Sequence, residues 1–286
     1  MKILVTGGRG LIGRFVVDAL VRSGHEVIGV DRPSSAPPAE GLNRATAEVE
    51  GDVSDAGLMN SLMAGVDAVV HLAAIPAPVG HTSRELLVAN SVATMTVLEA
   101  AGEQGAKAVV MASSISILGM AWSAEPMDPL YLPVDEAHPL RPTEGYALSK
   151  ECDEAAARMA SRRWDLPTVA MRFPNTTTRE QLEARRVDAD AAGRLAKELW
   201  AYLDVRDAAR AVELAIAAMT EGALRGCSVV NVIADDVLLD QSLAHLMSEW
   251  HPNVPFDAQE YGLRGAYDTA RARELLGFEA EHLIHR

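Results

Sequence analysis

This sequence has few cysteines, and it also lacks a long apolar run and a signal peptide. These features limit the classes of protein to which it can belong. The chain has 286 residues and only two cysteines, Cys152 and Cys227, which give neither a disulfide framework nor the spacing of a metal site. No uninterrupted apolar run approaches the roughly 18 residues that a membrane-spanning helix needs. The first residues, MKILVTGG, lack the apolar stretch of a signal peptide. We therefore expect a cytoplasmic protein that is neither exported nor embedded in a membrane and that holds no metal.

Basic residues are fewer than acidic residues. The sequence carries 26 Lys and Arg against 40 Asp and Glu, which gives a formal net charge of −14. Nucleic-acid binding draws its affinity from basic side chains that release counterions, and an anionic membrane surface repels an acidic protein. These two classes of partner are thus excluded, and a small-molecule ligand is expected. The apolar fraction of 49% suits a large buried core and argues against disorder.

Short apolar segments alternate with longer helical patterns over the first two thirds of the sequence. The apolar segments are 2–6, 25–30, 67–73, 107–113 and 167–173. Runs this apolar are typical of strands that are covered on both faces, and the alternation indicates repeated βαβ units. The predicted fold class is therefore α/β, with a Rossmann-type, doubly wound parallel sheet.

The alternation breaks after Phe173 and returns near residue 201. We assign residues 1–173 plus about 201–233 to a dinucleotide-binding domain. Residues 174–200 plus 234–286 are assigned to a small, discontinuous C-terminal substrate lobe. The proline-dotted segment 121–142 is expected to form a long functional loop.

A glycine-rich turn follows the first predicted strand. Gly7, Gly10 and Gly13 stand three residues apart in TGGRGLIG, directly before a predicted helix. This spacing permits a tight turn, close approach of the backbone to a pyrophosphate, and tight packing of the helix on the strand. The start of the helix, with Leu11 and Ile12, would offer free amides and a positive dipole end to the phosphates. The pattern predicts a dinucleotide site, with a purely structural turn as the alternative.

An acidic residue indicates which dinucleotide is bound. Asp31 ends the second predicted strand, 18 residues after Gly13. A carboxylate there can accept hydrogen bonds from the ribose hydroxyls and would repel a 2′-phosphate, so NAD is favoured over NADP. Arg32 beside it and Arg9 in the turn leave NADP open.

Tyr146 and Lys150 are four residues apart in a segment with a helical pattern. Residues at this spacing share one face of a helix, so both side chains can reach the same cleft. A phenol is a poor base at neutral pH, but a neighbouring ammonium stabilises the phenolate and so permits proton exchange. We therefore predict that Tyr146 transfers a proton and that Lys150 supplies its supporting charge. The alternative is an ordinary solvated helix face.

Several motifs, taken in order, resemble those of the extended short-chain dehydrogenases/reductases, the NAD-dependent epimerase/dehydratase group. Besides the glycine turn and the Tyr-Lys pair they are the segments 51–53, 71–74, 90–94, 112–119, 172–175, 202–207 and 268–278, so the resemblance covers nearly the whole chain. It implies that the cofactor is bordered by Leu11, Ile12, Asp52, Val53, Leu72, Ala73, Ala74, Asn90, Tyr146, Lys150 and Phe173.

The resemblance also implies the third catalytic group. Aligned on Gly119, the catalytic serine of the family falls on Ser114. Its hydroxyl would donate to the substrate oxygen while Tyr146 exchanges the proton, as hydride moves to or from the nicotinamide. Ile115 and Asn175 would then contact the substrate. Leu118 stands where the family usually has a tyrosine, which argues against a polar substrate contact from that position.

The predicted substrate lobe is short, because only 28 residues separate Asn175 from Asp204. Nucleotide-sugar members of the resembled family carry a longer insertion there, and a pocket needs residues to build its walls around a nucleotide. The short lobe resembles that of hexuronate dehydrogenases. Arg179, Arg185 and Arg186 are therefore candidates for binding a substrate carboxylate, with solvated helix arginines as the alternative.

Together these features predict an NAD(P)-dependent oxidoreductase for a small sugar, sugar acid or related alcohol or carbonyl compound. One alternative is an NAD-dependent sugar epimerase, in which the same three side chains oxidise a sugar carbon transiently and the cofactor stays bound. A non-catalytic dinucleotide sensor is the third reading, and the intact Ser-Tyr-Lys set argues against it. The resemblance further implies a homodimer formed through the helix around 85–103 and the Tyr-Lys helix.

Overall fold

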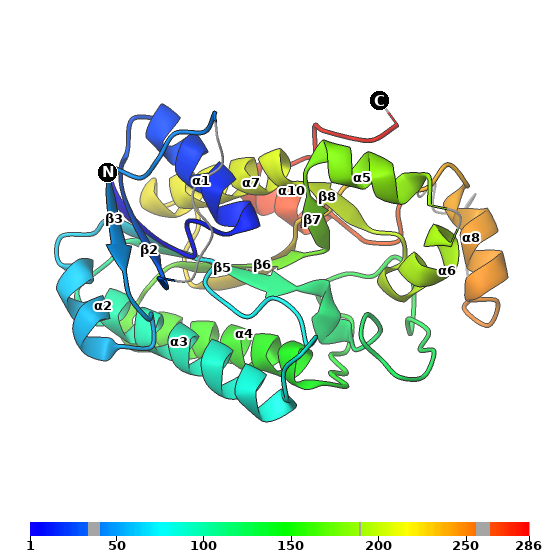
Figure 1. The fold of residues 1–286 in the computed structure, drawn as a ribbon, viewed down its shortest axis with the longest axis horizontal. Coiled ribbons are helices and arrows are strands. Elements are labelled where there is room, and N and C mark those ends of the chain that lie inside the picture. Colours follow the sequence, from blue (N-terminus) through cyan, green and yellow to red (C-terminus); the bar gives the residue numbers. More distant parts are fainter. Residues whose placement is uncertain (34–40, 189, 256–263, 286) are drawn as a thin grey trace.

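Seven parallel strands form the central sheet, in the order β3-β2-β1-β4-β5-β6-β9 (Figure 1). The strands are β1 (Lys2–Thr6), β2 (Glu26–Asp31), β3 (Ala47–Glu50), β4 (Ala68–His71), β5 (Ala108–Ser114), β6 (Thr168–Phe173) and β9 (Cys227–Asn231). The computed structural model describes residues 1–33, 41–188, 190–255 and 264–285. The strand order runs outward in both directions from β1 and β4, so the predicted doubly wound α/β fold is confirmed.

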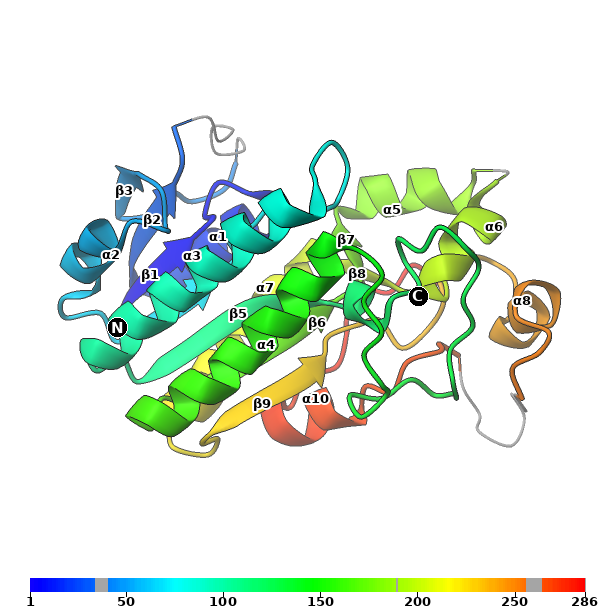
Figure 2. The ribbon, with the colours of Figure 1, turned by 90° about the horizontal axis from the view of Figure 1, so that it is seen from below.

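Helices cover both faces of this sheet. On one side lie α1 (Leu11–Arg22), α7 (Val205–Thr220) and α10 (Ala270–Leu276), and on the other α2 (Ala56–Met63), α3 (Ser83–Glu103) and α4 (Gly145–Trp164) (Figures 1 and 2). The side chains of β1 point alternately to the two faces of the sheet. Ile3 and Val5 belong to the buried cluster beneath α1 and α7, and Leu4 belongs to the buried cluster beneath α2 and α3. Burial on both faces explains why these strands read as continuous apolar runs.

A third buried apolar cluster lies beyond the carboxyl ends of β5 and β6. It includes residues of α5 (Arg179–Arg186), α6 (Ala191–Leu195), the 3-10 turn η2 (Ala196–Glu198) and α8 (Leu243–Trp250), beside a small parallel sheet of β7 (Asn175–Thr177) and β8 (Tyr202–Asp204). The segment after β5 joins this cluster through the 3-10 turn η1 (Ile115–Leu118), Leu132 and Val134. The segment 121–142 therefore packs onto the predicted lobe.

No helix in the described ranges combines the length and the apolar character that crossing a membrane requires. The longest, α3, is 21 residues and carries charged side chains near both ends.

Candidate active site

The glycine turn between β1 and α1 is shaped to receive a phosphate group. Gly7 has a φ of 72°, and a Cβ on it would lie 2.7 Å from the Ala73 backbone nitrogen. A Cβ on Gly13 would collide with the Gly7 carbonyl oxygen. The first hydrogen bond of α1 runs from Arg14 N to the Gly10 oxygen at 3.1 Å, so the amides of residues 11–13 have no partner within the helix. The turn therefore offers free backbone donors and a surface without side chains, which fits a diphosphate.

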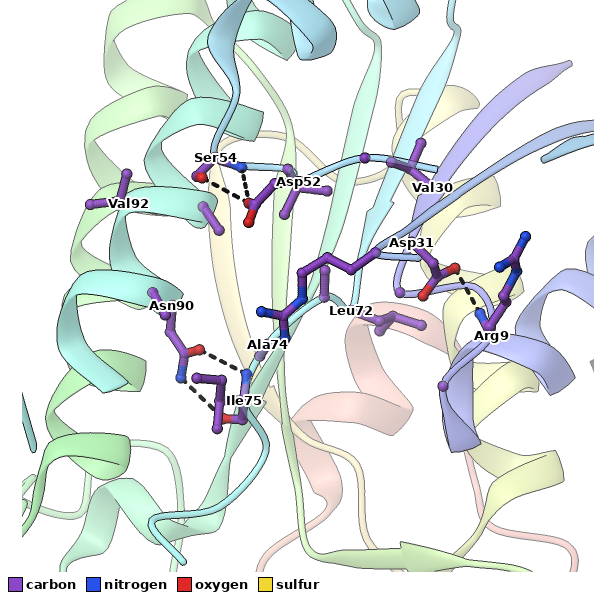
Figure 3. A pocket seen from close by; sticks show the side chains of 18 of the residues that line it. Arg9, Val30, Asp31, Asp52, Ser54, Leu72, Ala74, Ile75, Asn90 and Val92 are labelled. Atoms are coloured by element: carbon purple, nitrogen blue, oxygen red, sulfur yellow. Dashed lines mark hydrogen bonds between the residues drawn. The ribbon is translucent and has the colours of Figure 1, made fainter. Parts of the chain in front are cut away.

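A cavity of about 510 Å³ opens beside this turn (Figure 3). Its walls include many of the residues predicted to border the cofactor, namely Gly7, Gly10, Leu11, Asp31, Arg32, Asp52, Val53, Leu72, Ala73, Ala74 and Asn90. Asp31 lies at the end of β2, where its Oδ2 accepts a hydrogen bond from Arg9 N at 2.9 Å. The structure thus brings these predicted residues to one cavity.

Two charged clusters flank the cavity. The guanidinium of Arg9 forms ion pairs with Glu48 at 2.9 Å and with Glu50 at 3.3 Å, both on β3. Asp52 accepts hydrogen bonds from the Ser54 amide at 2.9 Å and the Ser54 hydroxyl at 2.7 Å. These hydrogen bonds lower the pKa of Asp52, so its carboxylate is ionised at neutral pH.

Asn90 borders the same cavity from α3, but its amide group is engaged with protein atoms. Its Oδ1 accepts from Ile75 N at 2.8 Å, and its Nδ2 donates to the Ile75 oxygen and to Ser149 Oγ at 3.2 and 3.1 Å. Ser149 Oγ in turn donates to the Tyr146 carbonyl at 2.7 Å. Asn90 therefore ties the loop after β4 to α4 while it borders the cavity.

A second cavity of about 510 Å³ adjoins the first and shares with it Gly7, Gly10, Leu11, Leu72 and Ala74. Its walls include all three predicted catalytic residues and most of the remaining predicted contacts, namely Ile12, Gly13, Ser114, Ile115, Tyr146, Lys150, Phe173, Asn175 and Arg185. The two cavities form a continuous trough across the carboxyl ends of the strands. Ligands of doubly wound sheets bind in this position.

Ser114 and Tyr146 come to the second cavity from different elements. Ser114 is the last residue of β5, and its Oγ accepts from Ser116 N and donates to Ser116 Oγ, both at 3.1 Å. Tyr146 lies in the first turn of α4, whose start is fixed by Glu144 accepting from Ala147 N at 2.8 Å. Each of the two side chains is 8% exposed, so each is buried at the cavity wall.

Lys150 is buried one helical turn beyond Tyr146. Its Nζ donates to the Ala112 carbonyl and to Asp153 Oδ2, both at 3.1 Å, and lies 5.9 Å from the centre of the Tyr146 ring. Burial acts to lower the pKa of Lys150, but the Asp153 carboxylate, the Tyr146 phenol and Glu154 outweigh it, so the pKa lies above its usual value. The ammonium is therefore charged at neutral pH. Asp153 stands three residues after Lys150 on the same helix face, a spacing that could have identified it from the sequence.

A buried ion pair supports the floor of this cavity. Arg172 on β6 donates to both carboxylate oxygens of Glu154 on α4, at 2.9 and 3.0 Å. Ser113, next to Ser114 in the chain, donates to Glu154 at 2.8 Å. Arg172 is therefore a structural residue, and the network holds β5, β6 and α4 together beneath Ser114.

The three lobe arginines have different environments. Arg185 borders the second cavity. Arg179 instead donates to the Leu283 carbonyl at 3.1 Å and to Glu183 at 3.3 Å, and Arg186 pairs with Glu183 and with Asp240. Of the three, the structure brings Arg185 to the cavity, whereas the Arg179 guanidinium contacts the C-terminal segment.

Comparisons with known proteins agree with this geometry. Residues 3–232 match the profile of the "NAD dependent epimerase/dehydratase family". A putative UDP-glucose 4-epimerase of Methanocaldococcus jannaschii is 31% identical over 60% of this chain and 55% of its own length. A uronate dehydrogenase of Pseudomonas putida is 29% identical over 63% of this chain and 63% of its own. The matches thus cover little more than half of these curated relatives.

The fold as a whole also has solved counterparts. A short-chain dehydrogenase/reductase superfamily protein from Agrobacterium tumefaciens, solved with bound NAD, aligns with a TM-score of 0.71 and 26% identity. That alignment covers 100% of this chain and 94% of the other. A UDP-galactose 4-epimerase aligns with a TM-score of 0.69 and 27% identity over 98% of this chain and 93% of the other.

Proposed function

Because the chain belongs to the NAD-dependent epimerase/dehydratase family, we propose that it is an NAD-dependent oxidoreductase for a small sugar, sugar acid or related alcohol or carbonyl compound. The observation that carries this proposal is that Ser114, Tyr146 and Lys150 border one cavity, which adjoins the cavity ending at Asp31. The Agrobacterium tumefaciens structure with bound NAD supports the choice of cofactor.

The residues of the trough fit NAD in a defined orientation. The free amides at the start of α1 would bind the diphosphate, and Asp31 would accept from the adenosine ribose hydroxyls. NADP is the alternative cofactor, but its extra phosphate would meet the Asp31 carboxylate, and Arg9 is already paired with Glu48 and Glu50. Phe173 and Lys150 border the other end, where the nicotinamide would lie and take up or give back a hydride.

The side chains of the second cavity then supply the proton chemistry. In the oxidation direction bound NAD would accept the hydride of the substrate C–H bond, and Tyr146 in its phenolate form would take the hydroxyl proton. The Ser114 hydroxyl, held by Ser116 N, turns its hydrogen from Ser116 Oγ to the substrate oxygen and stabilises the charge there. The Lys150 ammonium stabilises the phenolate form of Tyr146. Reduction reverses each of these transfers.

The small lobe supports a small substrate. The described residues between Asn175 and Asp204 form β7, α5, α6, η2 and β8, so few residues are available to enclose a nucleotide. The match with the Pseudomonas putida uronate dehydrogenase takes up the same share, 63%, of both chains, so the two have similar lengths. We propose a sugar acid whose carboxylate binds Arg185, because a guanidinium matches a carboxylate with two hydrogen bonds.

An NAD-dependent sugar epimerase is the second candidate. The observation in its favour is that several relatives carry the name UDP-glucose 4-epimerase, including the Methanocaldococcus jannaschii protein. An epimerase retains its cofactor and returns the hydride to the opposite face of the sugar, so reduced cofactor would not accumulate in solution. A dehydrogenase must release reduced cofactor in every turnover. Absorbance of free NADH therefore separates the two.

We also propose a homodimer in a reducing cytoplasm, with residues 174–200 plus 234–286 as the substrate lobe. The helices α3 and α4 lie side by side on one face of the sheet (Figure 2) and carry exposed apolar side chains, Val88, Val92 and Leu148. Small residues on α4 permit close approach of a second copy. Cys152 and Cys227 are free thiols, as a reducing compartment requires. Sedimentation that gives a monomer mass at every concentration would contradict the dimer.

The substitution Tyr146→Phe tests the proposed mechanism. It removes only the proton-transfer group, so NAD affinity in calorimetry should stay within about twofold while turnover falls by about 100-fold to 10,000-fold. The matched control is Tyr131→Phe, which removes a phenol that donates to Asp135 in the 121–142 segment. The control should keep its turnover. Unchanged turnover in Tyr146→Phe would remove this residue from the mechanism.

A further inference from the structure

The substrate end of the trough carries two opposite charges that lack partners. Arg185 at the end of α5 and Glu198 in η2 both border the second cavity. Arg185 Nη1 and Glu198 Oε2 are buried, and neither atom accepts or donates a hydrogen bond within the described residues. Among those residues the two side chains also do not pair with each other, although Arg185 is close enough to influence the pKa of Glu198.

This arrangement differs from the ion pair beneath the catalytic serine. Arg172 and Glu154 are 3% and 0% exposed and satisfy each other with two short hydrogen bonds, whereas Arg185 and Glu198 are half-buried residues with one buried, unpaired atom each among the described residues. A buried charge without such a partner is destabilising, so it persists where a ligand supplies the missing contact. Burial raises the pKa of Glu198, and the Arg185 guanidinium offsets this only in part. The nearby Tyr267 hydroxyl is also buried and has no hydrogen-bond partner among the described residues.

The two groups require complementary chemistry from a ligand. Arg185 needs an acceptor and is best matched by a carboxylate, whereas Glu198 needs a donor such as a hydroxyl. A sugar acid carries both a carboxylate and several hydroxyls. We propose that Glu198 is a specificity-determining residue, which accepts a hydrogen bond from a sugar-acid hydroxyl while Arg185 binds the carboxylate. This inference rests on the proposed function.

The charge of Glu198 also disfavours a different class of substrate. The formal charges of Arg185 and the Glu198 carboxylate sum to zero. A ligand with one carboxylate therefore adds a single negative charge to this end of the cavity. The diphosphate of a nucleotide sugar carries more negative charge and would meet the Glu198 carboxylate at short range, where repulsion between like charges is strong. Glu198 thus selects a sugar acid over a nucleotide sugar at a site of the same overall fold.

Calorimetry on the NAD-loaded protein tests this role without relying on turnover. The probes are D-glucuronate and UDP-glucuronate, titrated into the wild type, Glu198→Gln, Glu198→Asp and the control Glu180→Gln, which removes an exposed charge from the same lobe. The wild type should bind glucuronate more tightly than UDP-glucuronate. Glu198→Gln should reduce this preference at least about tenfold, because it removes the charge and keeps the shape. Glu198→Asp, which keeps the charge, and the control should retain the preference against the diphosphate.

Three outcomes would overturn the role of Glu198. They are an unchanged preference in Glu198→Gln, an equal loss of preference in Glu180→Gln, and a wild type that binds UDP-glucuronate more tightly or binds neither probe. Failure of the proposed function is a separate result, namely glucuronate binding without production of NADH. Circular dichroism of each variant checks that the fold is intact before the titrations are compared.

Discussion

The buried histidine of β4 makes a quantitative prediction about stability. The ring of His71 lies between Thr6 Oγ, 2.8 Å from Nδ1, and Thr94 Oγ, 3.1 Å from Nε2, and the residue is only 4% exposed. Burial, with a further contribution from the Lys150 ammonium, lowers the pKa of His71 to about 3. The imidazole is therefore neutral in the folded protein and links β1, β4 and α3 under the glycine turn.

The sign of the effect follows from the two states. In the unfolded chain the histidine pKa is about 6.5, so below that pH the unfolded chain binds a proton that the folded protein does not bind. The free energy of unfolding must then decrease as pH falls from about 6.5 towards 3, and the full contribution is present above this range. At pH 5 the loss due to this one residue amounts to about 2 kcal/mol, from 1.5 pH units at about 1.4 kcal/mol each.

Urea unfolding at about pH 7 and about pH 5 measures this contribution. The variant His71→Gln should be less stable at both pH values, since it disturbs two hydrogen bonds, but it should lose about 2 kcal/mol less than the wild type between them. The control His81→Gln removes an exposed imidazole and should keep the wild-type difference. An identical pH dependence in the wild type and His71→Gln would refute the reasoning, because the folded state would then protonate His71 as readily as the unfolded state.

Three further substitutions test other parts of the molecule. Glu154→Gln leaves Arg172 buried without its counter-charge, so urea unfolding should report a loss of about 3–5 kcal/mol, and a loss of less than about 1 kcal/mol would contradict the importance of the pair. Gly13→Ala places a methyl group against the carbonyl of the first turn glycine, so NAD affinity in calorimetry should fall at least about tenfold, and unchanged affinity would argue against a diphosphate at this turn. Glu48→Gln releases one of the carboxylates that hold Arg9, so the affinity for NADP relative to NAD should rise up to about fivefold, whereas a constant ratio would show that Arg9 does not influence cofactor choice.

The fold and the cofactor end of the trough could be predicted from the sequence because their signals are local. The turn from Gly7 to Gly13 follows directly on its strand, and Asp31 ends the next one. Parallel strands end at the same edge of a sheet, so residues after different strands converge there without any need to know the long-range packing. Ser114 was predicted from the family resemblance, and the structure places it with Tyr146 at one cavity.

The substrate end was less predictable because it depends on contacts between distant segments. Nothing near Arg179 in the sequence indicates that its guanidinium reaches the carbonyl of Leu283, and nothing near Glu198 distinguishes it from an exposed helix residue. The contribution of Leu132 to the lobe was hidden in the same way, since a long loop carries no periodic pattern that reveals its partner. The pairing of Arg172 with Glu154 likewise joins two elements whose register only the folded structure fixes.

Formation of reduced nicotinamide by the wild-type protein tests the central claim most directly. The purified protein is mixed with an excess of NAD and a panel of hexuronates, aldoses and nucleotide sugars, and the absorbance band of NADH is followed through many turnovers. We predict that NADH accumulates beyond the amount of enzyme with a hexuronate. A protein that binds NAD but yields no free NADH with any sugar, or that inverts a sugar while the band stays flat, would contradict the assignment as a net oxidoreductase.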